Sequence, residues 1–467
     1  MKPSEKQLWN YGTVDDDVEE YEAQIDSLKE SSHGVPRPSV LVIPFFLFIV
    51  ASYFLLGLFT AVPDSFLTVE QRANRILTQN PLIGNHIYGN DFKKKFEKGG
   101  FTAQVDIPRL AQGKNGGAFW SAYVPCPAQA WNFSDETYEP FVRATLEQID
   151  LFHRLSKEYP KQFTPTPDHL SALAAFSSGR LISPLAIEGL HQIGNSLSTL
   201  RLYHRLGVRY ATLTWNCHNK YADAAIVPDP DSGRNTAKKP LHHGLSSAGR
   251  TLIHEMNRMG MFVDLSHVSA ETMRDVLTGA PSPDPDDPSK FWNASIAPPI
   301  FSHSSAYSVC PHPRNVPDDV LQLVKERRSL VMVNFNPGFI SCVPGPETPE
   351  TGIPVLDSGN ATLKQVVKHI RYIGELIGYD YVGIGSDFDG IQDVPKGLED
   401  VSKFPDLVAE LLRQGVSDAD AAKVVGRNLL RVWEEVDRVA EELQKSVKPV
   451  EDDLPSMRGI YDIGREL

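Results

Sequence analysis

The sequence is poor in positive charge and in cysteine. Lys and Arg total 46 against 59 Asp and Glu, so the formal net charge is -13, and only four cysteines occur in 467 residues. Without a basic surface to neutralise phosphate groups, nucleic-acid binding is not expected. The hydrophobic content of 41% also excludes a chain that is disordered over most of its length.

Several common catalytic motifs are missing. There is no Gly-x-Ser-x-Gly elbow and no Walker-type phosphate loop, which excludes α/β serine hydrolases and P-loop enzymes. His254 is followed four residues later by Arg258, so the HExxH zinc-peptidase pattern fails. The sequence also has no CxxC pair, the pattern that is typical of a structural zinc site.

One long hydrophobic run is present. Residues 40–62 are 23 residues without a charge, long enough to cross a hydrocarbon core of roughly 30 Å. Because 39 residues precede the run, it predicts a retained membrane anchor rather than a cleaved signal peptide. The alternative, a buried apolar helix, is disfavoured by Pro44. The acidic residues 1–39 then form a flexible cytosolic tail.

The features that indicate a compartment all follow the run. Positive charges flank it equally, but the glycosylation sequons lie after it, at Asn132, Asn293 and Asn360. So do the four cysteines, whose even number suits two disulfides in an oxidising compartment, with four free thiols as the alternative. These features predict a single-pass membrane protein with a cytosolic N-terminus and a lumenal or extracellular catalytic domain. The cysteines are Cys126, Cys217, Cys310 and Cys342.

The rest of the chain alternates short β-branched or aromatic runs with helical patterns. This order predicts parallel strands joined by crossover helices, the α/β class of the (β/α)8 barrel. One helix, over 362–378, places Leu363, Val366, Val367, Ile370, Ile373 and Leu376 on one face. Seven strands are predicted, over residues 118–124, 181–187, 208–214, 261–266, 298–302, 329–335 and 381–386.

Polar residues follow the carboxyl ends of these strands, where barrel active sites are built. They are Glu188, Trp215 with Asn216, His267, His303 and Asp387. Two imidazoles and a carboxylate on separate strands are a ligand set for Zn²⁺. A single histidine after a strand is more often a hydrogen-bonded core residue, so the prediction depends on the joint occurrence.

At this point the sequence resembles the membrane (renal-type) dipeptidases, zinc peptidases related to the amidohydrolase barrels. The matching stretches cover roughly residues 100–440 and include LAIEGLHQIGNSLSTLRLYHRLGVRYATLTWNC, MFVDLSHVSAETM, FSHSSAYSVCPHPRNVPDDVL and VGIGSDFDG. The resemblance implies cleavage of dipeptides, a homodimer, and disulfides joining Cys126 to Cys217 and Cys310 to Cys342.

The resemblance also implies residue roles. Glu188 would bridge two zinc ions, with His267 and His303 completing the second metal, and a bridging hydroxide would attack the dipeptide carbonyl. Asp387 would take the proton from this nucleophile and give it to the leaving amine. Arg314 would bind the substrate carboxylate, which suits its planar fork.

The sequence departs from the family pattern in three places. Trp215 stands where the family has a substrate-contacting histidine, and His218 or Asn216 is the candidate replacement. The C-terminus has no hydrophobic tail for lipid anchoring, so the N-terminal span must anchor the protein. The first-strand His-x-Asp motif, which binds the first zinc in the family, is absent, and about one strand is missing between Ile83 and Gly84.

Two hypotheses explain the missing strand. Either an exon boundary is mis-assigned and the natural protein is a working dipeptidase with two zinc ions, or the chain is a true variant with a single metal. Such a variant would be a feeble enzyme or a binding or structural ectodomain. Another amidohydrolase activity, such as lactone or phosphotriester hydrolysis, is disfavoured by Arg314. The predicted organisation is an anchor at 40–62, a linker and truncated barrel start at 63–99, the barrel at 100–440 and a tail at 441–467.

Overall fold

The structure is a computed structural model that describes residues 87–279 and 292–451. The chain divides into two units, Met1–Gln79 and Asn80–Leu467, and every described residue belongs to the second. The predicted anchor at 40–62, the acidic tail and the junction at Ile83 and Gly84 lie outside the described residues. Within the described residues, no helix has the length and apolar character needed to cross a bilayer.

Seven parallel strands form one sheet, in the order β1-β2-β3-β6-β7-β8-β11. Each corresponds to one of the seven predicted runs, so the α/β prediction is confirmed. Most strand residues are buried, as expected when helices cover a parallel sheet. The strands are β1 (Trp120–Ala122), β2 (Leu185–Glu188), β3 (Val208–Thr212), β6 (Phe262–Asp264), β7 (Ile300–Phe301), β8 (Leu330–Val333) and β11 (Val382–Ile384).

The sheet is curled into a half-barrel, and the strand order places β1 at one end and β11 at the other. Among the described residues, no strand pairs with both β1 and β11 to close it. A barrel of this class needs eight strands. Seven are found among the described residues, and the opening lies between the first and last strands of the sheet. The prediction that one strand is lacking at Ile83 and Gly84 falls outside the described residues and stays a prediction.

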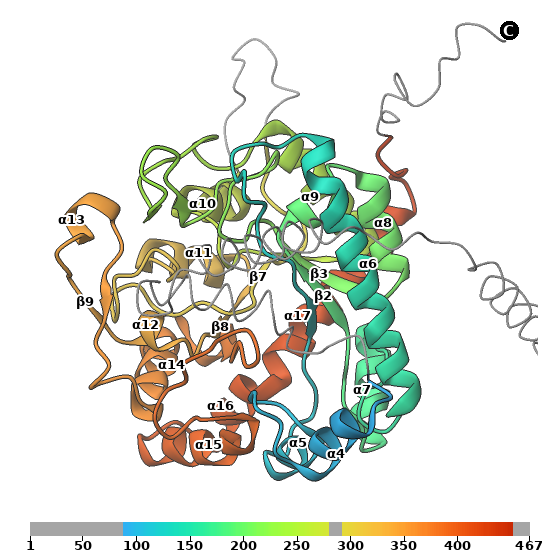
Figure 1. The fold of residues 1–467 in the computed structure, drawn as a ribbon, viewed down its shortest axis with the longest axis vertical. Coiled ribbons are helices and arrows are strands. Elements are labelled where there is room, and N and C mark those ends of the chain that lie inside the picture. The colour runs from blue at the N-terminus through green and yellow to red at the C-terminus, as the bar shows by residue number, and fades with distance from the viewer. Residues whose placement is uncertain (1–86, 280–291, 452–467) are drawn as a thin grey trace, which may run out of the picture. The chain divides into compact units, whose positions relative to one another are not determined.

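Helices pack around the curled sheet (Figure 1). Among them, α8 contacts β3, α9 contacts β6, and α14 and α17 both contact β8 and β11. Their bounds are α4 (Asn90–Lys98), α5 (Ile107–Gln112), α6 (Asp135–Glu158), α7 (His169–Ser177), α8 (Leu197–Arg205), α9 (Ser247–Met259), α10 (Ala270–Thr278), α11 (Asp318–Glu326), α12 (Pro337–Ile340), α13 (Thr348–Thr351), α14 (Leu363–Ile377), α15 (Phe404–Arg413), α16 (Asp418–Ala422) and α17 (Asn428–Gln444).

Helix α14 shows how local sequence sets these elements. Val366, Ile370 and Ile373 recur at helical spacing and are buried against the sheet. The helix ends at Gly378, which has a φ of 107°. Glycine adopts this backbone conformation readily because it lacks a Cβ. The prediction that Leu376 belongs to the buried face is wrong: it is 37% exposed, and Ile377, one position further round the helix, is buried instead.

The two ends of the sheet are joined through the segment before β1. Val105 and Leu110 pack with Val401 in a small core that also contacts Trp120 of β1 and Phe388, which follows β11. The Gln104 backbone N–H donates to Asp389 Oδ1 at 2.6 Å, and the Asp389 N–H donates to Gln104 Oε1 at 2.6 Å. These contacts hold the ends of the half-barrel near each other.

Both disulfides implied by the resemblance are present. Cys126 is bonded to Cys217, which links the loop after β1 to the loop after β3, and Cys310 is bonded to Cys342. The alternative of four free thiols is therefore wrong. The sequon asparagines Asn132, Asn293 and Asn360 all have exposed side chains. Two short antiparallel pairs, β4 (Val227–Pro228) with β5 (Asn235–Thr236) and β9 (Cys342–Val343) with β10 (Val355–Leu356), were not predicted.

Candidate active site

Three side chains from three strand ends meet at one point. Glu188 is the last residue of β2, His267 follows β6 and His303 follows β7. Glu188 Oε1 lies 2.8 Å from His267 Nε2 and 3.3 Å from His303 Nε2, and the two Nε2 atoms are 2.9 Å apart. The sequence prediction that these residues converge is therefore borne out by the geometry.

Hydrogen bonds fix which ring nitrogen faces this point. His267 Nδ1 lies 3.0 Å from Asn216 Oδ1, which can only accept, so Nδ1 carries the proton. The His303 Nδ1 donates to Ser302 Oγ at 2.8 Å, because that hydroxyl donates its own proton to Asp264. Both Nε2 atoms therefore face the Glu188 carboxylate, and the cation between them is a proton donated to Glu188 in the metal-free site or a metal ion that replaces it.

The triangle of ligand atoms fits a tetrahedral metal. With bonds of about 2.0–2.1 Å to nitrogen and oxygen, neighbouring ligands of a tetrahedral zinc ion are about 3.3–3.4 Å apart. The observed edges of 2.8, 2.9 and 3.3 Å are close to this, and slightly short. The donor set and its spacing therefore fit a metal ion with a position left open.

Asp264 orients one ligand of the Glu188, His267 and His303 cluster through hydrogen bonds to its neighbours. Its Oδ2 accepts hydrogen bonds from Thr212 Oγ1 and Ser302 Oγ, each at 2.6 Å, and its Oδ1 accepts from the Ser302 backbone N–H at 2.7 Å. This buried carboxylate thereby orients Ser302 and, through it, His303. The sequence analysis missed Asp264, although an acidic residue inside the apolar run MFVDLS was a signal for it.

The site changes the pKa values of its own groups. Burial raises the pKa of the Glu188 carboxyl, but hydrogen bonds from His267 and His303 outweigh it and hold the pKa well below its usual range. Burial, reinforced by the Arg314 charge, holds the pKa of His267 well below its usual range. The site thus keeps Glu188 as a carboxylate and His267 as a neutral imidazole, the forms that bind metals. Burial lowers the pKa of His303, but the Asp387 and Glu188 charges outweigh burial and raise it.

Asp387 follows β11 and faces the same region. Its Oδ2 accepts a hydrogen bond from Asn334 Nδ2 at 3.2 Å, and its φ of 61° is unusual for a residue other than glycine. Burial raises the pKa of the Asp387 carboxyl, and the Glu188 charge raises it further. A raised pKa suits a carboxyl group that exchanges protons.

Arg314 is a buried cation without a full set of partners. It is 3% exposed, and Nε and Nη2 have no hydrogen-bond partner in the structure. Its guanidinium carbon lies 5.0 Å from the centre of the Phe339 ring. Burial lowers the pKa of Arg314 to about 10, opposed by the Asp387 and Glu188 charges, so it remains a cation at neutral pH.

The residues around Trp215 take different roles from those expected. The Trp215 ring packs on Tyr123 at 5.0 Å and lies 6.3 Å from the His267 ring. His218 cannot replace the family histidine, because its ring nitrogens face Lys239 O and the Ala224 N–H. Asn216 instead orients His267.

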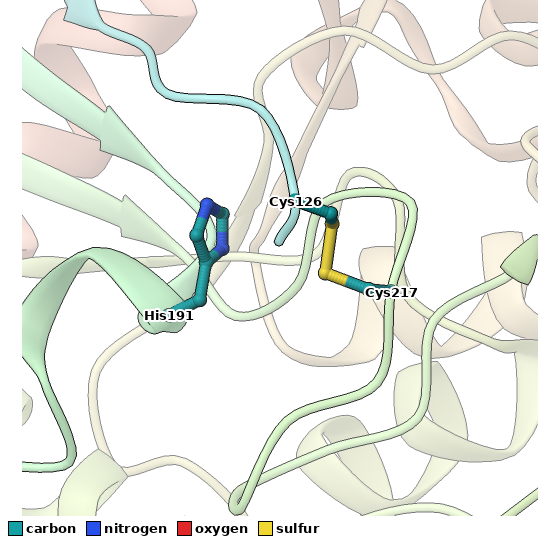
Figure 2. A group of neighbouring side chains, drawn as sticks. All are labelled: Cys126, His191 and Cys217. Carbon is teal, nitrogen blue, oxygen red and sulfur yellow. A yellow bond between two sulfur atoms is a disulfide. The ribbon is translucent and has the colours of Figure 1, made fainter. Parts of the chain in front are cut away.

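A second group with metal-ligand side chains lies close by. Cys126, His191 and Cys217 place ligand atoms within 4.8 Å of one another, but the two sulfur atoms are bonded to each other (Figure 2). Within the described residues, the Glu188, His267 and His303 cluster is thus the one set of three ligands free to bind a metal. A curled parallel sheet with such a cluster at its carboxyl edge defines the class: a metal-dependent hydrolase.

Comparison with known proteins agrees with this class. Residues 70–447 match the family model for the membrane dipeptidases, peptidase family M19. Dipeptidase aclJ of Aspergillus oryzae is 43% identical over 372 residues, which are 79% of this chain and 78% of that protein. An uncharacterised dipeptidase of Schizosaccharomyces pombe is 43% identical over 404 residues, covering 83% and 88%. The chain belongs to the membrane dipeptidase family and is a hydrolase of the dipeptidase type.

Solved structures show the same fold. A metallo peptidase from Rhodobacter sphaeroides, bound to a phosphinate mimic of the dipeptide L-Ala-D-Ala, superposes with a TM-score of 0.59 at 23% identity, covering 78% of this chain and 96% of that one. Dipeptidase AC, a metallo peptidase of family M19, gives a TM-score of 0.59 at 25% identity, covering 78% and 95%. The resemblance identified from sequence is confirmed.

Proposed function

We propose that this protein hydrolyses the peptide bond of dipeptides at a zinc centre held by Glu188, His267 and His303. The observation that carries the proposal is the convergence of their three ligand atoms, with edges of 2.8 to 3.3 Å, from three separate strands. One carboxylate and two imidazoles favour zinc over the hard cations Mg²⁺ and Ca²⁺. When bound, the metal supplies a Lewis acid that polarises a carbonyl and lowers the pKa of water.

Arg314 supplies the preference for a free carboxylate. A buried guanidinium with two unpartnered nitrogens leaves a forked pair of donors for one anionic group. Burying a charge without partners is costly, and a substrate carboxylate would remove that cost. The partner that this site fits is therefore a peptide short enough for its C-terminal carboxylate to reach Arg314 while its amide reaches the metal cluster.

Asp387 is the group that moves the proton. We assign it the transfer of a proton from the attacking water to the leaving amine nitrogen, since burial raises its pKa. Asn334 donates to Oδ2, which leaves Oδ1 of the same carboxyl to exchange the proton. Hydrolysis then yields one amino acid with a new carboxylate and one with a new amine.

A second candidate is a binding or structural ectodomain with little catalysis. It is favoured by the missing His-x-Asp motif and by Trp215, which together leave one metal position and alter a substrate contact. In that case dipeptides would bind through Arg314 without rapid turnover. The number of bound metal ions separates the two candidates: two zinc ions per chain, as in a complete family site, would favour the dipeptidase, and a single ion would favour the second candidate.

We also propose that residues 40–62 anchor the protein in a membrane, with the catalytic domain on the lumenal or extracellular side. Two disulfides and three exposed sequon asparagines support that compartment. A homodimer is proposed by family resemblance. Glycosidase treatment and protease protection of microsomes that contain the full chain would test the orientation.

The function is tested with purified full-length protein and zinc. We expect cleavage of dipeptides with free ends, and loss of that cleavage when the C-terminal carboxylate is amidated. Glu188→Gln should abolish turnover and lower zinc content, whereas the exposed control Glu271→Gln should change neither. Equal cleavage of free and amidated dipeptides would contradict the role of Arg314. Dipeptide binding without turnover would favour the second candidate.

A further inference from the structure

His191 lies beside the disulfide between Cys126 and Cys217. It belongs to η2 (Leu190–Ile193), the short helix after β2, while the cysteines lie in the loops after β1 and β3. Ligand atoms of the three residues are within 4.8 Å of one another. Figure 2 shows the imidazole next to the disulfide, with one ring nitrogen on the side that faces the sulfur atoms.

The histidine has an unused acceptor. Its Nε2 lies 2.9 Å from Val124 O, and because a carbonyl can only accept, Nε2 carries the proton. The lone pair is therefore on Nδ1, which has no hydrogen-bond partner although His191 is fully buried. Leaving a buried polar atom without a hydrogen-bond partner destabilises the folded protein. The side chain is thus held ready for a partner that the oxidised structure does not supply.

The surroundings suit a metal ligand. Burial lowers the pKa of His191 to about 4, against the hydrogen bond to Val124 O, so the ring is neutral at physiological pH. Gly189 leaves room next to the ring: its φ is 104°, and a Cβ there would lie 2.6 Å from Nδ1. A side chain at position 189 would fill the space beside the lone pair.

We propose that reduction of the Cys126–Cys217 disulfide opens a second metal site, in which the two thiolates and Nδ1 of His191 bind a zinc-type divalent ion. Two soft sulfur ligands and one imidazole select zinc and similar ions and leave a fourth coordination position. This inference does not depend on the peptidase activity, because the site shares no ligand with Glu188, His267 and His303.

The chemistry balances with a dithiol as the reductant. A thiolate of the dithiol attacks the sulfur of Cys126, the less buried of the two residues, and the thiolate of Cys217 leaves. The second thiol of the reductant then displaces the Cys126 thiolate and becomes part of a cyclic disulfide. Two electrons pass from the dithiol to the protein. Binding of the divalent ion releases the two cysteine protons, and the site becomes neutral.

The other disulfide is an internal control. Cys310 and Cys342 are also bonded to each other. Among the described residues, however, no histidine or carboxylate has a ligand atom within 4.8 Å of both sulfur atoms. Reduction of that pair exposes two thiols without a third ligand. The proposal therefore predicts that the two disulfides differ in metal binding after reduction, although both yield a dithiol.

The test compares Cys310→Ser/Cys342→Ser, which keeps the pair beside His191, with Cys126→Ser/Cys217→Ser, which removes it. Each full-length protein is reduced with a dithiol, freed of reductant without oxygen and titrated with Co²⁺. We expect a thiolate-to-cobalt charge-transfer band and one additional bound ion only in the first variant and only after reduction. The Glu188 cluster contains no sulfur and does not give this band. Adding His191→Asn to the first variant should weaken Co²⁺ binding at least tenfold.

A second measurement needs no cysteine variant. In the reduced natural sequence, Zn²⁺ should protect Cys126 and Cys217 from alkylation, while Cys310 and Cys342 react. Equal reaction of all four cysteines with and without Zn²⁺ would overturn the proposal. So would two free thiols beside His191 without a charge-transfer band, because His191 would then only pack against the disulfide.

Discussion

Asn216 Oδ1 accepts a hydrogen bond from Nδ1 of His267 at 3.0 Å. The contact connects the loop after β3 to the loop after β6, and it sets which nitrogen of His267 faces Glu188. His267 has a φ of 67°, so its backbone also holds an uncommon conformation. The geometry of the proposed metal site therefore depends on Asn216, which is not one of the three ligand residues.

We expect Asn216→Ala to weaken zinc binding by about 10–100-fold, because partners that orient metal-bound histidines have effects of this size. The measurement is a zinc titration against a competing chelator. Asn132→Ala, at an exposed position, is the matched control and should leave affinity unchanged. Unchanged affinity in Asn216→Ala would show that the backbone alone orients His267.

The strands could be predicted from sequence because burial on both faces demands continuous apolar runs. Each of the seven predicted runs overlaps an observed strand, and Glu188, His267 and His303 at the strand ends do meet at one edge. The role of Asp264 could not be predicted in the same way. Asp264 accepts hydrogen bonds from Thr212 in β3 and from Ser302, which directly follows β7. Contacts of this kind depend on the register between strands, which local sequence does not encode.

The residues around Trp215 also show that local sequence does not determine which side chains meet in the folded protein. Sequence spacing made His218 as good a replacement for the family histidine as Asn216. In the structure, the chain turns after β3 so that His218 is 2% exposed and bonded to backbone groups, while Asn216 reaches His267. The direction of a side chain in an irregular loop depends on the contacts of the folded chain.

Arg314→Lys should lower kcat/KM for dipeptides with a free carboxylate by about 10–100-fold, since a point charge replaces a forked pair of donors. The effect should appear mainly in KM, because the carboxylate is bound in both ground and transition states. Any residual cleavage of amidated dipeptides should be insensitive to the change. Arg274→Lys, at a surface ion pair with Asp319, serves as the control. A loss of the same size for amidated substrates would mean that Arg314 acts on stability.

Asp389 makes the stability of the half-barrel depend on pH. Burial raises the pKa of this carboxyl from 3.8 to about 6. A raised folded-state pKa means that stability is fully present below about pH 4 and is lost as the pH rises through 6. A shift of about two pKa units corresponds to roughly 3 kcal/mol above that range.

We therefore expect Asp389→Asn to be more stable than the natural protein at pH 7 by up to roughly 3 kcal/mol, with the difference vanishing near pH 4. The amide oxygen can still accept the bond from the Gln104 N–H. Urea unfolding of metal-free protein between pH 4 and 7 measures the difference. Asp393→Asn, at an exposed position, is the matched control variant. A constant difference across this range would place the pKa of Asp389 outside it.

Trp215→His tests whether the altered contact limits the chemistry. The sequence resemblance implies that family members have a histidine at the position of Trp215. That histidine is expected to contact the substrate carbonyl. An imidazole N–H would add a donor to the oxygen that gains charge in the transition state, and such a donor contributes on the order of 10²–10³ in rate. We expect Trp215→His to raise kcat at least tenfold, and Trp215→Phe, which keeps an aromatic ring against Tyr123, to leave it unchanged. If both variants lose activity equally, the indole N–H itself contacts the substrate, and this site has evolved a different donor at the same position.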